Sequence, residues 1–518
     1  MYFRFAAGLP RFLRSPVRLD VARATIATRL QGREERFLSI LRSAVFNQPH
    51  SPYLALLRMA GCDYGDVEQM LRAEGLEAML ERLARSGVWL SFDEFKGRQR
   101  IVRGSWSLDV SAADFDSPLG GGHIVARSGG GTGPGTRTVY DLAHISAARS
   151  AYKLLTFDAF GVSRLPVIMW SPVAPGYGPL ELLAHAGMGK PPLHWFSPVA
   201  PTPGTSSAKD RLITRYLVLA SKMAGVGLPS PQHIPPSEVW AVTKSVLDAR
   251  ARHGGCVVLT DPSCAVRICR DALARSERLE GVLFIIGGEP VTRHKLAFLE
   301  GAGARSSPLF VFIEGGYVGI SCLNPADADE VHLLSDSVAL IQHRRSIEHA
   351  RQDVDAFLFT TLLPTAPKVL INVESGDWGR VRRRDCGCYF ERLGFHEHIS
   401  TVRSFDKFTS AGMNVTASSL LHIVEEVLPS TFGGTLLDYQ LREEEGEDGV
   451  PRITVVIDPS VGPVDDSAIV DAIFTELLRH GKRGALEQAW RDSGTFRVAR
   501  ESPQVTARGK LLPLHVKR

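Results

Sequence analysis

The sequence lacks the features that mark membrane-spanning, secreted and nucleic-acid-binding proteins. No uninterrupted apolar run reaches the roughly 18 residues that a membrane-spanning helix needs. The chain has 7 cysteines in 518 residues, an odd and sparse count that does not suit a disulfide-stapled scaffold. Its formal net charge of +4 is small, whereas nucleic-acid binders usually carry a concentrated basic face. We therefore expect a cytoplasmic protein with no integral membrane segment and no nucleic-acid partner.

The N-terminus also lacks the marks of a secretory signal. The opening residues, MYFRFAAGLPRFLRSPVR, interleave arginines and prolines with apolar side chains. They contain neither a clean apolar segment nor a small-residue cleavage site. We expect a basic first helix or a loose tail here, and a weak membrane-surface anchor is the alternative.

The length and the periodicity predict a chain with more than one core. A chain of 518 residues exceeds the size of one ordinary core. Between residues 20 and 90, apolar residues recur at threes and fours with charges between them, which predicts helices. Asp66 is placed to cap one of them, because an aspartate before the first turn accepts backbone N–H bonds. We assign residues 1–100 to an N-terminal helical region that is part of a large domain.

The middle of the chain alternates short apolar runs with helical patterns. Five runs predict buried strands, namely VIMW, CVVLT, GVLFIIGG, LFVFI and KVLINV. This alternation is typical of an α/β fold with a largely parallel sheet. After about residue 403 a helix, two strands and a second helix predict a separate small α+β domain of roughly 110 residues.

A glycine-rich loop is the strongest local motif. The segment RSGGGTGPGTRT, Arg127 to Thr138, holds five glycines and three threonines. Glycine permits close approach and positive φ, so such a loop can wrap its N–H groups around phosphate oxygens. It is not a Walker loop, because no Gly-Lys-Ser/Thr follows. A plain surface linker is the alternative.

Two more motifs follow apolar strands. IIGGEPVT, from Ile285 to Thr292, turns the chain where ligands bind in open α/β sheets, outside the carboxyl ends of strands. In LFVFIEGGYVGISC, Glu314 stands at a strand end, where a carboxylate can hold Mg²⁺. The alternatives are a tight turn without a ligand and a solvated or salt-bridged glutamate.

Together the three motifs resemble the adenylate-forming superfamily, and within it the phenylacetate–CoA ligase-like branch. The resemblance implies a large N-terminal adenylation domain with mixed or parallel sheets and helices, and a small mobile α+β C-terminal domain. It implies that Phe310 replaces the tyrosine that stacks on adenine and that Glu314 is the Mg²⁺-associated glutamate. The implied ATP-binding residues in the first two motifs are Ser128, Gly129, Gly130, Gly131, Thr132, Gly133, Gly288, Glu289 and Pro290.

The resemblance continues in RRRDCGCYFERLGFHEHISTVRSFDKFTSAGMNV and in TARGKLLPLHV. By this match Asp385 binds the ribose hydroxyls, Arg403 contacts the same nucleotide region, and Asp406 is the hinge. The domains are then an adenylation core at 101–405 and a C-terminal domain at 406–518. Lys510 matches the catalytic lysine, whose charge would neutralise the carboxylate and α-phosphate as the adenylate forms.

Two departures from the family pattern concern the phosphate loop and the hinge. The loop has Gly133-Pro134-Gly135 where the family has Gly-Lys-Pro, so the phosphate-contacting lysine is absent and Arg137 is a candidate substitute. Ser404-Phe405 stands ahead of Asp406, where the family has Gly-Arg-x-Asp before its own second aspartate.

The resemblance implies that a carboxylic acid and Mg·ATP give acyl-AMP and pyrophosphate. Acyl transfer follows, with coenzyme A as the expected acceptor. Transfer to an amine or to a carrier-protein thiol is the alternative, and a catalytically silent nucleotide-binding relative is a further one. The sequence does not identify the acid.

Cys322, His332, Cys386 and Cys388 form a candidate zinc site. Three thiolates and one imidazole are a common structural set, although these spacings do not fit a zinc finger. The superfamily match would bring the segment of Cys322 and His332 together with the segment of Cys386 and Cys388. Unpaired buried thiols are the alternative. His398, beyond the Cys-x-Cys run, is expected to be solvated.

Overall fold

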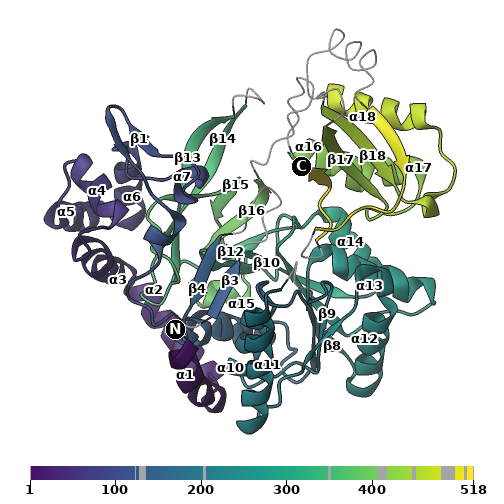
Figure 1. The fold of residues 1–518 in the computed structure, drawn as a ribbon, viewed down its shortest axis with the longest axis horizontal. Coiled ribbons are helices and arrows are strands. Elements are labelled where there is room, and N and C mark those ends of the chain that lie inside the picture. The colour runs from purple at the N-terminus through teal and green to yellow at the C-terminus, as the bar shows by residue number, and fades with distance from the viewer. Residues whose placement is uncertain are drawn as a thin grey trace.

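A mixed sheet of twelve strands runs through the large N-terminal part of the chain, with helices on both faces (Figure 1). The computed structural model describes residues 2–122, 124–127, 136–201, 206–347, 352–404, 417–445, 451–479, 496–506 and 510–516. The strand order is β13-β14-β15-β16-β12-β11-β10-β9-β8-β5-β6-β7. A smaller C-terminal unit carries its own four-stranded sheet, so the α/β class and the large-and-small arrangement are confirmed. Within these ranges, no helix has both the length and the apolar character needed to cross a membrane.

The N-terminal region is helical, as its periodicity predicted. Its main helices are α1 (Tyr2–Arg14), α2 (Leu19–Gln31), α3 (Arg33–Ile40), α4 (Pro52–Met59), α5 (Tyr64–Glu74) and α6 (Leu76–Arg85). The N-cap of α5 is Asp63, whereas Asp66 is the third helical residue and completes a capping box with it. Helix α1 buries Phe5, Leu9 and Leu13 against the sheet domain, which confirms the prediction of a basic first helix.

The half of the sheet from β10 to β7 is parallel. Its strands are β5 (Val167–Trp170), β6 (His194–Ser197), β7 (Pro231–His233), β8 (Cys256–Thr260), β9 (Val282–Gly287) and β10 (Arg305–Phe312). Helices α10 (Gly178–Gly187), α11 (Ala208–Met223), α12 (Trp240–His253), α13 (Pro262–Ala274) and α14 (Arg293–Gly301) belong to this half. Strand β9 is buried on both faces, with Leu283 and Ile285 in one core and Phe284 and Ile286 in another.

The other half of the sheet is antiparallel, so the expectation of a largely parallel sheet was wrong. Its strands are β11 (Gly316–Ser321), β12 (Val331–Leu333), β13 (Val338–Ile347), β14 (Gln352–Thr361), β15 (Val373–Arg383) and β16 (Glu397–Ser404). The run KVLINV is buried but is not a strand. Asn372 has φ 53°, and its side-chain amide bonds the carbonyls of Leu80 and Val88, which breaks the extended backbone.

The C-terminal unit has a separate core built from its own helices and sheet. Its elements are α16 (Ala417–His422), η5 (Ile423–Val427), α17 (Leu428–Phe432), β17 (Tyr439–Glu445), β18 (Pro451–Ile457), α18 (Asp466–Arg479), β19 (Phe496–Arg500) and β20 (Leu514–Val516). The predicted hinge residue Asp406, and with it the boundary at 405/406, lies outside the described residues.

The C-terminal unit docks beside α13 and α14 of the large domain (Figure 1). Leu436, Leu437 and Leu511 join the core on the β9 face that holds Phe284. A buried ion pair links Lys295 of α14 to Glu425 of η5 at 2.7 Å. This docking places the C-terminal segment against the carboxyl ends of the parallel strands.

Candidate active site and metal centre

The turn after β9 meets the C-terminal segment at Lys510. Strand β9 ends at Gly287, and Gly288 turns the chain with φ 85°, a conformation that side chains other than glycine rarely adopt. Lys510 Nζ donates a 2.5 Å hydrogen bond to the Gly288 carbonyl oxygen, across 222 residues of sequence. The predicted catalytic lysine and the predicted nucleotide-binding turn therefore form one site.

Two buried carboxylates flank this turn, and one of them was not predicted. Asp261 follows β8 directly, and its Oδ1 accepts a 3.0 Å hydrogen bond from the Tyr177 hydroxyl. Glu289 accepts from the backbone N–H and the hydroxyl of Ser263, at 3.0 and 2.5 Å. Burial raises the pKa of Asp261 to about 7, opposed by the charge of Lys510 and assisted by Glu289. An aspartate directly after the apolar run CVVLT, at the ligand-binding end of a parallel strand, was the signal available in the sequence.

The rest of the Gly-Gly-Glu-Pro turn is fixed by the neighbouring helices. The Pro290 carbonyl oxygen accepts a 3.1 Å hydrogen bond from Lys295 Nζ. Thr292 caps α14 and also donates to Glu425 Oε2 at 2.6 Å, so the turn is tied to the C-terminal unit. The position of the turn thus depends on the docking of that unit.

Glu314, the expected magnesium ligand, is buried and paired with a lysine from the N-terminal region. It follows β10 in the chain, and its Oε1 forms an ion pair with Lys96 Nζ in which each side chain is 6% exposed. Burial lowers the pKa of Lys96, and the charge of Glu314 opposes that shift. As arranged here, the charge of Glu314 is already neutralised, so this carboxylate alone does not make a magnesium site. Sequence reasoning missed Lys96 because no motif surrounds it.

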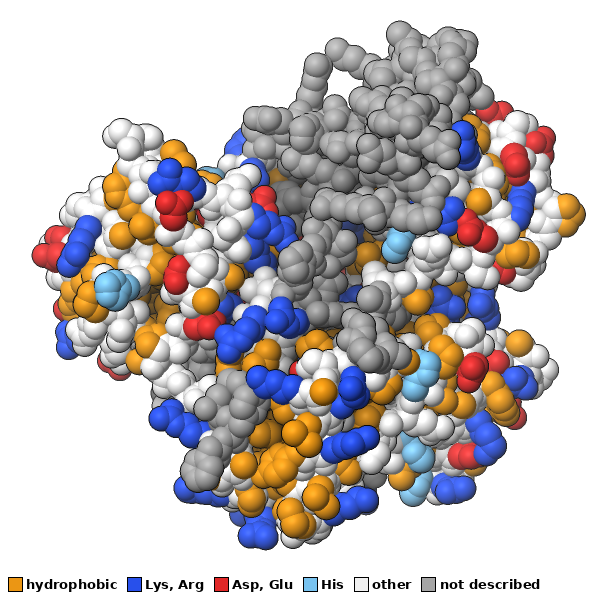
Figure 2. Space-filling view, viewed as in Figure 1, with side chains coloured by type: hydrophobic (Ala, Val, Ile, Leu, Met, Phe, Trp, Pro, Cys, Tyr) orange, Lys and Arg blue, Asp and Glu red, His pale blue; other side chains and the backbone are white. Residues whose placement is uncertain are grey.

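A basic cavity lies beside this pair. Its volume is about 310 Å³, and its lining residues are Lys96, Arg98, Ala112, Ala113, Thr136 and Arg137. Thr136 and Arg137 follow the glycine-rich loop, whose predicted phosphate-binding residues Ser128 to Gly133 lie outside the described residues. The strands that flank the loop, β3 (Ile124–Arg127) and β4 (Arg137–Tyr140), pair as a hairpin. Figure 2 shows lysine and arginine side chains gathered near the centre of one face of the molecule.

The remaining predicted nucleotide contacts lie on the antiparallel side. Phe310 is half-buried on β10, and its ring centroid lies 6.1 Å from that of Phe359. Arg403, on β16, lies 3.6 Å from Asp329 Oδ2. Asp385 is exposed and lies with Glu391 and His396, next in the chain to Cys386. The strand paired with β16 carries another carboxylate, Asp377, in register with Ser404 beside Arg403.

The four predicted metal ligands come together at one end of β11, β12 and β16. His332 Nε2 lies 3.1 Å from Cys388 Sγ and 3.7 Å from Cys386 Sγ. The thiol of Cys322 is hydrogen-bonded to Cys388 and holds the pKa of that cysteine well below its ordinary value. The neighbouring imidazole of His332 favours the same thiolate.

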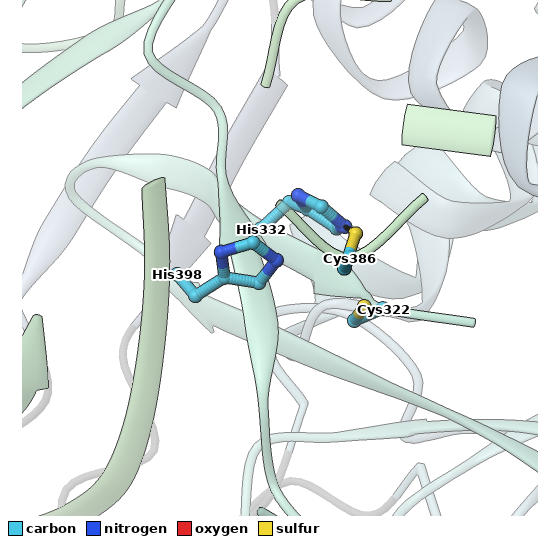
Figure 3. Close-up of side chains that lie close together, drawn as sticks. All are labelled: Cys322, His332, Cys386 and His398. Atoms are coloured by element: carbon cyan, nitrogen blue, oxygen red, sulfur yellow. Dashed lines mark hydrogen bonds between the residues drawn. The ribbon is translucent and has the colours of Figure 1, made fainter. Parts of the chain in front are cut away.

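His398 belongs to this cluster as well, so the expectation that it is solvated was wrong. It pairs with His332 across β12 and β16, and its side chain is 1% exposed. The ligand atoms of Cys322, His332, Cys386 and His398 all lie within 4.8 Å of one another, and Figure 3 shows these side chains converging. Cross-strand pairing brought His398 inward, and a local pattern could not predict that.

The geometry of the cluster fits a zinc ion. Two ligands of one tetrahedral zinc, at about 2.3 Å for sulfur and about 2.1 Å for nitrogen, lie about 3.6 Å apart. The observed separations of 3.1 and 3.7 Å bracket that value. His332 Nδ1 lies 2.8 Å from the Phe395 carbonyl oxygen, so Nδ1 carries the proton and Nε2 turns its lone pair to the sulfurs.

Comparison with known proteins gives a likeness in structure. No protein-family model matches the chain. No curated protein sequence matches it either. A solved 2-hydroxyisobutyryl-CoA ligase, in the postadenylation state in complex with R3-HIB-AMP, has a TM-score of 0.57 at 13% identity, covering 95% of this chain and 90% of that chain. A second structure of that ligase, in complex with 2-HIB-AMP, has a TM-score of 0.55 at 12% identity, with coverage of 94% and 89%. The chain therefore has the fold of the adenylate-forming acyl-CoA ligases.

Proposed function

We propose that this protein activates a carboxylic acid with ATP, forming acyl-AMP and releasing pyrophosphate. One observation carries the proposal: Lys510 of the C-terminal segment reaches the Gly288 carbonyl oxygen in the Gly-Gly-Glu-Pro turn. In this fold family a lysine from the small domain and this turn act on the same nucleotide. The likeness in fold to a ligase solved with an acyl-AMP supports the same activity.

The chemistry requires positioning and neutralisation of charge. The carboxylate of the acid attacks the α-phosphorus, and pyrophosphate leaves from the opposite side. Lys510 is the group placed to neutralise the carboxylate and the α-phosphate as they approach. Gly288, Glu289 and Pro290 form the nucleotide turn beside it.

The basic cavity offers the positive charge that the glycine-rich loop lacks. Arg137 follows that loop directly, and Lys96 lines the same cavity. Both are candidates to bind the phosphates of Mg·ATP, in which the magnesium ion enters with the nucleotide. Phe310, Asp385 and Arg403 remain predictions for the adenine and ribose, and Glu314 remains one for magnesium.

Coenzyme A is the acceptor that the fold favours for the second step. The solved proteins of similar fold are CoA ligases by name, which supports transfer of the acyl group to the thiol of CoA. Transfer to an amine or to a carrier-protein thiol uses the same adenylate. CoA, an amine and a carrier-protein thiol can be distinguished by measuring which of these nucleophiles raises the turnover of the acid.

The first experiment measures pyrophosphate release from Mg·ATP with a panel of acids, each with and without CoA. We expect release that depends on an acid and increases with CoA. Lys510→Ala should abolish release and retain ATP binding, whereas Lys244→Ala, at a lysine whose side chain is 59% exposed on α12, should match the wild type. Full release by Lys510→Ala would refute the role of this lysine. ATP binding without release for every acid would favour a silent relative.

We also propose that the cysteine–histidine cluster holds a structural zinc ion. Cys322, His332 and Cys386 are three of its ligands, and Cys388 or His398 is the fourth. Elemental analysis of the purified protein should find one zinc per chain. Cys322→Ser should lose it, and Cys62→Ser, at a half-buried thiol between α4 and α5, should keep it. Zinc-free wild-type protein that is fully folded would contradict this assignment.

A further inference from the structure

Helix α11 carries the three most exposed large hydrophobic side chains in the described part of the chain. Leu212 is 67% exposed, Leu219 is 58% exposed and Met223 is 68% exposed. They lie seven and four residues apart, so all three project from one side of the helix. The opposite side of α11 is buried, with Leu217 and Val218 against the large domain. Single exposed apolar residues are normal, but a stripe of three on one helix face indicates an interaction surface.

Helix α1 lies beside this stripe. The Tyr216 hydroxyl of α11 donates a 3.2 Å hydrogen bond to the Ala6 carbonyl oxygen of α1, and the ring centroids of Tyr216 and Phe5 lie 6.3 Å apart. The apolar residues of α1 face the core. Its outward side carries three exposed arginines, namely Arg4, Arg11 and Arg14. The stripe of α11 and the outward side of α1 thus form one surface, which we call the α1/α11 surface.

The charge of the α1/α11 surface is one-sided. The two helices together hold seven arginine or lysine residues and a single acid, Asp210. The whole chain, in contrast, is nearly balanced, with 60 basic and 56 acidic residues. Asp210 is engaged in a capping box with Ser207 at the start of α11. In Figure 2, hydrophobic and basic side chains gather in the lower part of the view, where Figure 1 places α1 and α11.

A lipid bilayer with anionic headgroups matches this combination of side chains. The apolar side chains of a surface helix enter the boundary between headgroups and acyl chains, and the basic side chains beside them bind lipid phosphates. The long stems of lysine and arginine let the charged end reach a phosphate while the stem covers apolar surface. A nucleic acid would use the charges but would leave the apolar stripe in water. A second copy of this chain, related by a twofold axis, would bring like charges face to face.

We propose that the α1/α11 surface docks on an anionic lipid bilayer. Leu212, Leu219 and Met223 enter the headgroup boundary, and the basic residues of both helices contact lipid phosphates. Helix α1 acts here through its charge, because its apolar side is already used in the core. The C-terminal unit lies on the other side of the view in Figure 1, so this contact does not involve it.

The test is co-sedimentation of the full chain with lipid vesicles. One set of vesicles contains equimolar phosphatidylglycerol and phosphatidylcholine, and the other contains phosphatidylcholine alone. We expect binding to the first set that weakens as salt is added, because salt screens charges at a surface. We expect little binding to the second set. The measurement needs neither an acid nor ATP, so its outcome does not depend on the proposed adenylation.

Two multiple variants separate the apolar contribution from the charged one. Leu212→Ser/Leu219→Ser/Met223→Ser should lower the partition coefficient by about 10-fold or more, because the apolar contact is removed. Arg11→Gln/Arg215→Gln should lower it by about 10- to 30-fold, the loss of two cations near an anionic surface. All five side chains are exposed, so both variants should melt at the temperature of the wild type.

Matched controls change the same kinds of residue on other elements. Val102→Ser/Leu119→Ser/Leu273→Ser replaces three apolar side chains that are 55%, 40% and 37% exposed. Lys244→Gln/Arg252→Gln removes two exposed cations from α12. Both controls should bind the anionic vesicles as the wild type does.

Three outcomes would overturn the proposal. Equal binding to both sets of vesicles would show that the basic residues have no part in it. Binding that the arginine variant loses and the serine variant keeps would make the surface a site for polyanions. Absence of binding to either set would exclude a bilayer, and a dimer in sedimentation velocity that the serine variant breaks would then assign the surface to a second copy.

Discussion

Lys96 and Glu314 form a buried ion pair although 218 residues separate them in the chain. Each side chain is 6% exposed, so neither charge is well solvated on its own. The pair joins the N-terminal region to the end of β10, and it lies at the cavity that Arg137 also lines. Its stability and its role with ATP can be measured separately.

Removing one partner of this pair should destabilise the fold strongly. Lys96→Met leaves the Glu314 charge buried and unpaired, which costs about 3–5 kcal/mol. The double variant Lys96→Met/Glu314→Gln should recover most of that loss in urea unfolding. Arg18→Met, in an exposed pair with Asp20, should cost less than about 1 kcal/mol. If the refolded double variant binds ATP like the wild type, Lys96 does not serve the phosphates.

Asp261 should make the stability of the protein depend on pH. Its pKa is about 7 in the fold, against an ordinary value of 3.8, so the folded state holds a proton that the unfolded state has lost. Stability therefore falls as pH rises between about 4 and 7, and it levels off above pH 7. Lys510, Glu289, Tyr177 and Cys264 are the neighbouring groups that act on this equilibrium.

The variant Asp261→Asn carries no such proton. The difference between its melting temperature and that of the wild type, measured by calorimetry, should shift in favour of the variant from pH 5 to pH 7. Above pH 7 this difference should stay constant. A difference that stays constant across this range would show that Asp261 does not titrate there. Asp109→Asn, exposed on the surface, should follow the wild type throughout.

The sequence predicted the parts of this site that local pattern encodes. Apolar runs identified β8 and β9, and a glycine pair identified the turn. The order of motifs led to Lys510, which by itself is one lysine in a basic tail. Lys96 and His398 could not be found in this way, because sheet pairing and contacts between distant segments determine their neighbours.

An apolar run in this sequence indicates burial but does not always indicate a strand. The segment KVLINV is apolar because it is buried. The side chain of its Lys368 donates to the Ala112 carbonyl oxygen and to Asp116, and these contacts take the place of pairing with a neighbouring strand. Conversely, β15 is a long strand with few buried residues, so its composition gave little signal. Apolar runs therefore predicted the buried parallel strands better than the partly exposed antiparallel strand β15.

The buried pair Lys295–Glu425 should control the docking of the C-terminal unit. The Lys295 side chain is 2% exposed and that of Glu425 is 4% exposed, so Lys295→Met leaves a buried carboxylate unpaired, at about 3–5 kcal/mol. Hydrogen exchange should accelerate in η5 and α17, and adenylation should slow because Lys510 is held less firmly at Gly288. Arg270→Met, whose partner is Asp438 and whose side chain is 39% exposed, should show a smaller change. Unaltered exchange in η5 would show that the apolar contacts suffice for docking.

Two carboxylates compete for the ribose of ATP, and the geometry favours the one that the motif match did not select. Asp385 is exposed beside Glu391 and His396, whereas Asp377 lies on β15 in register with Ser404, next to Arg403 on β16. The ground for this preference is that Asp377 lies one register position from Arg403, the other residue expected at the ribose. We expect Asp377→Ala to raise the KM for ATP about 10-fold or more, the loss of a charged hydrogen bond, and Asp385→Ala to change it little. The reverse order would restore Asp385 as the ribose ligand and would place the nucleotide nearer to the cysteine cluster.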